Sequence, residues 1–213
     1  MFKKLLIRLL RPSVVYTSGN DINEEYLKEE DIKDTEISLI EAEHSIDRLS
    51  TNIQYLITES ASLLLDNNPY PTRVFKTIEE LQPLSASIQK IHGTSIFRIV
   101  LMHVKDQLFN NTFQLSEEEI QIRRDLFGQI ENNGTIDLMS IQSQLLDKYF
   151  LNFKNYWESV ISNLKHKDAI IKRREYLIER SEEFISLMSS RGINKYNSIL
   201  FDYIKYNKSA LGK

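Results

Sequence analysis

Only six glycines and four prolines interrupt the 213 residues of this chain, and that scarcity constrains its fold more than any motif does. Many-stranded β proteins need frequent tight turns, which glycine and proline form most easily. No glycine or proline occurs between Asp137 and Ser190. Long uninterrupted segments of this kind are typical of helices. We therefore expect an all-α protein, a helical bundle of about seven helices.

The composition excludes several classes of site. Hydrophobic residues make up 41% of the chain and charged residues 27%, which is enough apolar surface for a folded core. Cysteine is absent, and this excludes disulfides, thiolate zinc sites and cysteine nucleophiles. A reducing compartment fits, so we expect a cytoplasmic protein, with membrane association left open. The net charge of −3 gives no overall attraction for nucleic acid, and we expect a protein partner or a homo-oligomer instead.

The N-terminal segment carries basic and apolar residues at a helical spacing. At about 100° per residue, apolar side chains of this segment share one face, opposite basic ones. The apolar residues are Phe2, Leu5, Leu6 and Leu9. Pro12 ends the segment, which is too short and too charged to span a membrane. This face can dock on a partner protein, on an anionic membrane surface through residues 1–11, or on the chain's own core.

The charge pattern divides the chain near residue 30. An acidic stretch from Asp21 to Glu36 follows the basic segment. We therefore assign residues 1–30 to a basic amphipathic helix with an acidic connector, and residues 31–213 to the helical bundle. A turn signal in the bundle marks a candidate internal boundary near 132–136.

Three segments of the bundle carry clear helix signals. Apolar residues at alternating spacings of three and four run through residues 31–66, like the seam of a coiled coil. They are Leu39, Ala42, Ile46, Leu49, Ile53, Leu56 and Leu63. Residues 94–109 are apolar on all sides, which predicts a buried central helix. Ser116 and Glu119 have the spacing of a capping box and predict a helix start.

Asp137 suits the N-cap of the next helical segment, which is one long helix to Ser190 or two in tandem. Paired apolar residues recur every seven positions in its second half. The pairs are Ile170 with Ile171, Leu177 with Ile178, and Phe184 with Ile185. Such a narrow stripe packs against one neighbour. We expect residues 31–66 and this segment to form a long antiparallel hairpin, like a coiled coil. The candidate partner contacts are Ile171, Ile178 and Ile185.

Arg98 and His103 have the spacing Arg-x4-His. This spacing resembles the nuclease motif of HEPN domains, which are all-helical bundles, and the resemblance covers these two residues. It implies a ribonuclease in which Arg98 and His103 are catalytic. The alternative is a buried helix at whose edges both side chains find hydrogen-bond partners, because helix positions five apart point about 140° from each other.

The sequence offers no complete metal or cofactor motif. Glu41 and His44 are spaced as in one half of a carboxylate-bridged di-iron site, but the second half is missing from the sequence. No phosphate-binding glycine loop and no nucleophile elbow occurs either. We therefore expect neither a metal nor a cofactor.

Basic residues gather between Lys165 and Arg180, where six cations face three acids. Lys172, Arg173 and Arg174 are the candidates there for contact with nucleic acid or with an acidic partner. A solvated helix face explains the same charges equally well.

Long amphipathic helices without a catalytic constellation favour a non-enzymatic function. We expect an adaptor or accessory subunit that binds another protein, or itself, through its helix faces, in a larger bacterial or mobile-element complex. One alternative is the HEPN-like ribonuclease. The other is a peripheral membrane protein docked by its N-terminal helix.

Overall fold

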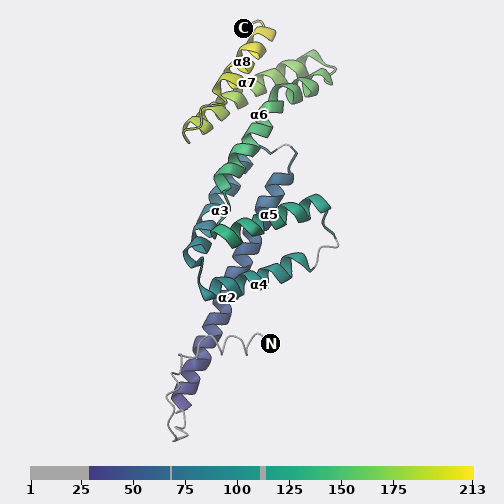
Figure 1. Cartoon of the computed structure of the whole chain (residues 1–213). Coiled ribbons are helices and arrows are strands. Elements are labelled where there is room, and N and C mark those ends of the chain that lie inside the picture. Colours follow the sequence, from purple (N-terminus) through teal and green to yellow (C-terminus); the bar gives the residue numbers. More distant parts are fainter. Residues whose placement is uncertain (1–28, 68, 111–113) are drawn as a thin grey trace, which may run out of the picture.

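Seven helices make up the part of the chain that the computed structural model describes, which is residues 29–67, 69–110 and 114–213, with side chains from residue 43 onward. They are α2 (Glu29–Leu65), α3 (Pro71–Ile91), α4 (Ser95–Phe109), α5 (Glu117–Asn133), α6 (Leu138–Ser162), α7 (Lys167–Ser189) and α8 (Asn197–Ala210). Figure 1 shows them as an elongated arrangement, and no strand occurs among these residues. The prediction of an all-α bundle of about seven helices is confirmed.

Side-chain caps fix where α5 and α6 begin. The Ser116 hydroxyl accepts a hydrogen bond from Glu119 N at 3.1 Å. The Asp137 carboxylate accepts one from Ser140 N at 2.9 Å. Each bond satisfies an N–H group that the first turn of a helix leaves unpaired. Both predicted helix starts are confirmed.

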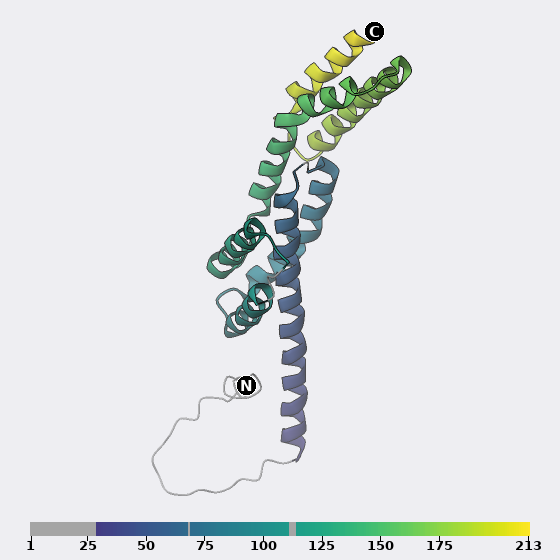
Figure 2. The same cartoon turned by 90° about the vertical axis from the view of Figure 1, so that its right-hand side faces the viewer.

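α2 is the axis of the first half of the molecule. Figure 2 shows α3, α4, α5 and the start of α6 around its C-terminal part, while its N-terminal part extends beyond them. Ile53, Leu56 and Ile57 of α2 are fully buried. They belong to a hydrophobic cluster to which all five of these helices contribute. The part of the predicted seam from Ile46 to Leu63 therefore lies in this cluster, while the side chains of Leu39 and Ala42 lie outside the described residues.

α4 is not the central helix that its composition predicts. Val100 and Val104 are fully buried, but Ile96 is 48% exposed and Met102 is 64% exposed. α2 already occupies the axis of the bundle, so α4 packs on α2 with one side and leaves the other side at the surface. The prediction that residues 94–109 are buried on all sides is wrong for this reason.

An aromatic core holds α6, α7 and α8 together. Phe150 stacks on Tyr196 with ring centroids 4.5 Å apart, and Phe153 meets Tyr203 edge-on at 5.2 Å. Phe75 of α3 belongs to the same cluster. The second half of the molecule is therefore joined to the first through α3 and α6.

The segment after Asp137 is two helices, and its second half pairs with α8 rather than with α2. α6 ends where the side chains of Ser162 and Asn163 both donate to the Ser159 carbonyl, at 2.8 and 2.9 Å. A continuing helix would use that carbonyl in its own backbone ladder. α7 then packs antiparallel on α8, while α2 packs on α3 to α6. An antiparallel hairpin is present, but α7 and α8 form it.

The turn between α5 and α6 lies at the internal boundary suggested by the sequence. Residues of α6 contribute to both hydrophobic clusters, so this helix bridges the two halves. The boundary near 132–136 stays a prediction.

Candidate functional site

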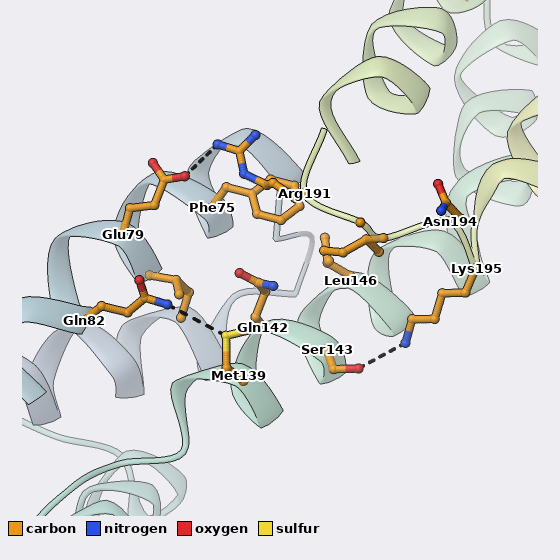
Figure 3. A pocket seen from close by; sticks show the side chains of 13 residues that line it. Phe75, Glu79, Gln82, Met139, Gln142, Ser143, Leu146, Arg191, Asn194 and Lys195 are labelled. Carbon is orange, nitrogen blue, oxygen red and sulfur yellow. Dashed lines mark hydrogen bonds and ion pairs between the residues drawn. The ribbon is translucent and has the colours of Figure 1, made fainter. Parts of the chain in front are cut away.

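A cavity of about 590 Å³ lies between α3, α6 and the connection from α7 to α8 (Figure 3). Ligand sites in proteins typically measure about 300–1,000 Å³. The residues that line it come from three separate parts of the sequence, which the junction of the two hydrophobic clusters brings together. We take this cavity as the candidate binding site.

A left-handed turn at Gly192 closes one side of the cavity. Its φ is 73°, and the next residue, Ile193, donates its N–H to Met188 O at 2.9 Å. This is a common way to end a helix, and glycine adopts it without steric cost. The turn carries Arg191 toward α3 and Lys195 toward α6.

The floor of the cavity is apolar. Phe75 and Ile78 of α3 and Leu146 of α6 line it and are at most 2% exposed. Ile193 adds a half-buried side chain from the α7–α8 connection. Met139 stands beside the floor and is 57% exposed. The apolar surface that a ligand in this cavity can reach is therefore mainly that of Met139 and Ile193.

Gln142 places a carboxamide beside these apolar side chains. The residue is 8% exposed, and Figure 3 shows its carboxamide directed into the cavity. Its side chain makes no hydrogen bond with any residue of the described part of the chain. A carboxamide offers two donor hydrogens and an acceptor oxygen. These groups are available to a ligand.

Arg191 lies at one edge of the cavity and has three contacts there. Its guanidinium donates to Glu79 Oε1 at 2.6 Å and to Leu187 O at 3.3 Å. The same guanidinium lies over the Phe75 ring, 4.7 Å from the centroid. Stacking of this kind fixes the guanidinium plane and so pre-orders its remaining donors.

Lys195 lies at another edge, in a chain of polar contacts on α6. Its ammonium donates to Ser143 Oγ at 3.0 Å and lies 2.9 Å from Asp147 Oδ1. The Tyr196 hydroxyl donates to the same Asp147 oxygen at 2.8 Å. Hydrogen bonds from Lys195 and Tyr196 lower the pKa of Asp147. Burial raises the pKa of Tyr196 to about 12.

Arg98 and His103, the predicted nuclease pair, lie on different sides of α4. Arg98 lines a second cavity, of about 430 Å³, together with Glu131 of α5. His103 Nε2 pairs with Gln107 Nε2 at 2.8 Å, and Gln107 bonds Gln54 of α2. The two side chains therefore face α5 and α2, and the helix does not bring them together in one site.

The predicted partner contacts on α7 lie on the side that faces α8. Ile171, Ile178 and Ile185 are half-buried there. Glu175 and Glu182, on the same side of α7, form ion pairs with Lys213 and Lys208 at 2.8 and 3.5 Å. α8 of the same chain covers this side of α7, but Phe184 of the same stripe also meets Phe150 of α6 and Tyr70, so the stripe has more than the one neighbour that its narrowness predicts.

The three predicted basic contacts have different surroundings. Arg174 faces inward and donates to the Glu158 carboxylate at 3.3 and 3.4 Å. Arg173 lies over the Trp157 ring, 6.0 Å from the centroid. Lys172 is exposed. Arg174 therefore serves the contact between helices rather than an external ligand.

The remaining predicted contacts, Phe2, Leu5, Leu6 and Leu9, lie outside the described residues and stay predictions. No helix in the described part is long and apolar enough to cross a membrane. In the same part, no three histidine, aspartate or glutamate side chains gather as a metal site would require.

The cavity could not be predicted from the sequence. Gln142 did carry a signal, because it is a polar residue in a stripe of buried apolar ones on α6. Arg191 and Lys195 carried none, since their neighbours Glu79 and Ser143 are distant in sequence.

Comparison with protein-family models, with curated proteins and with solved structures found no match to this chain.

Proposed function

We propose that the protein is a non-enzymatic helical adaptor or accessory subunit that binds another protein at the cavity between α3, α6 and the α7–α8 connection. The observation that carries the proposal is the carboxamide of Gln142, a residue only 8% exposed, which points into the cavity without a partner in the described chain. Sites that recognise a ligand combine an apolar surface with a few placed polar groups of this kind.

The polar groups of the cavity are better suited to binding a ligand than to catalysis. Ser143 and Lys195 are spaced like a nucleophile and its base, but such a base must be neutral to accept a proton. Hydrogen bonds to Tyr196 and Asp147 raise the pKa of Lys195, so its ammonium stays charged at neutral pH. The Gln142 carboxamide does not titrate. None of these three groups can take up a proton near pH 7.

The proposal is tested by blocking the cavity and purifying the protein from its native host. Ser143→Trp places a large ring at the edge of the cavity, and Gln144→Trp places the same ring on the exposed side of α6 as a matched control. We expect wild type and Gln144→Trp to copurify with a stoichiometric partner, and Ser143→Trp to lose it. Circular dichroism of both variants checks that they have kept their helical structure.

Two results would contradict the proposal. One is a wild-type protein that is purified alone as a monomer. The other is a partner that Ser143→Trp retains at full stoichiometry. A homo-oligomer that Ser143→Trp dissociates would support binding at this cavity and identify the partner as a second copy of the chain.

A further inference from the structure

We infer that the ligand of the cavity is an extended acidic segment of a partner polypeptide, with a bulky apolar side chain on the floor and its main chain on Gln142. The inference rests on the proposed function and adds the chemistry of the partner. Three features of the cavity carry it: the floor, the unpartnered carboxamide and the placement of the two cations.

The floor requires an apolar group. Phe75, Ile78 and Leu146 present their side chains to the cavity and are otherwise buried in the two hydrophobic clusters. Beside this floor, burial of an apolar ligand group against Met139, which is 57% exposed, and the half-buried Ile193 removes apolar surface from water on both sides of the contact. A purely polar ligand would leave this surface unused.

The carboxamide requires a ligand that both donates and accepts hydrogen bonds. A peptide group offers one N–H donor and one C=O acceptor, which match the oxygen and the NH₂ group of Gln142. An alkyl or aromatic ligand without such groups would cover Gln142 and leave its polar atoms without water or a partner. An extended main chain beside an apolar side chain meets both demands in one molecule.

The cations favour acidic flanking residues. Arg191 and Lys195 both line the cavity from the α7–α8 connection, where Arg191 contacts Glu79 of α3 and Lys195 contacts Asp147 of α6. Both carboxylates are 59% exposed, so these ion pairs are weak in water and a carboxylate of the ligand can replace them. Two cations, Arg191 and Lys195, line the cavity against one carboxylate, Glu79, and this positive balance disfavours a basic segment such as residues 2–11 of this chain.

The test is selection of short random peptides, displayed on phage, by the full-length protein. We expect the enriched peptides to share a bulky apolar residue next to aspartate or glutamate. Binding of a selected peptide should weaken about tenfold in Gln142→Leu, as one lost hydrogen bond in a buried site predicts. Gln144→Leu, on the exposed side of the same helix, should bind like wild type. Charge reversal in Arg191→Glu should weaken binding further.

Several outcomes would overturn the inference: no enrichment, enrichment of basic peptides, or equal binding by wild type and Gln142→Leu. These results are distinguishable from failure of the proposed function. If a native partner copurifies and is lost in Ser143→Trp while acidic peptides do not bind, the cavity binds a protein but the partner chemistry inferred here is wrong.

Discussion

Among single residues, Glu158 of α6 joins three helices. Its carboxylate accepts hydrogen bonds from Tyr203 Oη at 2.9 Å and Tyr206 Oη at 3.2 Å, both on α8, in addition to those from Arg174 of α7. The side chains of Arg174 and Glu158 are 12% and 26% exposed. A shielded carboxylate with donors from both neighbours fixes how α7 and α8 sit on α6.

Glu158→Ala should lower the free energy of unfolding by about 2–4 kcal/mol, because it leaves the Arg174 guanidinium without its anion in a shielded site. Urea denaturation followed by circular dichroism measures this loss. Glu179→Ala, at an exposed position of α7, should change the stability by less than about 0.5 kcal/mol. An equal loss in both variants would contradict the role assigned to Glu158.

Asp147 should make stability depend on pH in the acidic range. Its pKa is lowered in the folded protein by Lys195 and Tyr196. Its contribution is therefore complete above the ordinary aspartate pKa of about 3.9 and is lost as the pH falls through the lower folded value. The carboxylate is largely exposed, so we expect Asp147→Asn to cost at most about 1 kcal/mol at neutral pH. Urea titrations at falling pH should show the difference from wild type shrinking. A difference that grows would contradict this account.

Among the helices and their ends, two glycines with nearly the same φ face different surroundings. Gly134 ends α5 at φ 69°, and Gly192 follows α7 at φ 73°. A Cβ added at Gly134 would lie 2.6 Å from His92 Cβ, whereas a Cβ added at Gly192 meets nothing within 4 Å. The absence of a side chain at Gly134 lets the end of α3 pack on the end of α5.

Gly134→Ala should therefore lower the free energy of unfolding more than Gly192→Ala does. In both variants, a residue with a Cβ in the left-handed backbone conformation lowers the free energy of unfolding by about 1–2 kcal/mol. Gly134→Ala adds about 1–3 kcal/mol for the displacement of His92. Thermal unfolding of the two variants measures the difference. Equal losses would mean that the contact with His92 adjusts freely.

Helix positions could be predicted from sequence, but helix partners could not. The seam from Ile46 to Leu63 and the caps at Ser116 and Asp137 are local signals, and they lie where periodicity and capping rules predict. The apolar stripe through Ile171 and Ile178 predicts that a helix packs on it, but it does not predict which helix. Any helix of suitable length satisfies that demand, and in the structure it is α8, which follows α7 in the chain, that packs along it.

For the molecule as a whole, buried tyrosines should make the folded state less stable at alkaline pH. Burial raises the pKa of Tyr149, Tyr196 and Tyr203, with that of Tyr196 at about 12. The unfolded chain ionises these hydroxyls near pH 10 and the folded chain does not. Their contribution is therefore complete below about pH 10 and is lost as the pH rises through the folded values.

We expect an alkaline titration to show tyrosinate absorbance from these residues only as the helical signal falls. Ultraviolet absorbance and circular dichroism, recorded on the same samples, measure the two changes. Phe replacements at Tyr149, Tyr196 and Tyr203 identify their share of the absorbance. Full ionisation of all three in a protein that is still folded would contradict their burial.

The candidate site depends on the whole molecule, which explains why sequence predicted only part of it. Gln142 was detectable as a polar residue within an apolar stripe. The cavity around it exists because α3, α6 and the α7–α8 connection meet where the two hydrophobic clusters join. Arg98 and His103 were predicted as a pair from their spacing in the sequence. In the structure that spacing puts the two side chains on different sides of α4.

The claim that a partner protein binds at this cavity is tested most directly by photo-crosslinking in the native host. A benzophenone amino acid replaces Met139, which lines the cavity and is 57% exposed, or Met102, which is 64% exposed on α4. We predict that position 139 crosslinks to one partner and that position 102 does not. Equal crosslinking from both positions, or crosslinking from position 102 alone, would contradict the account.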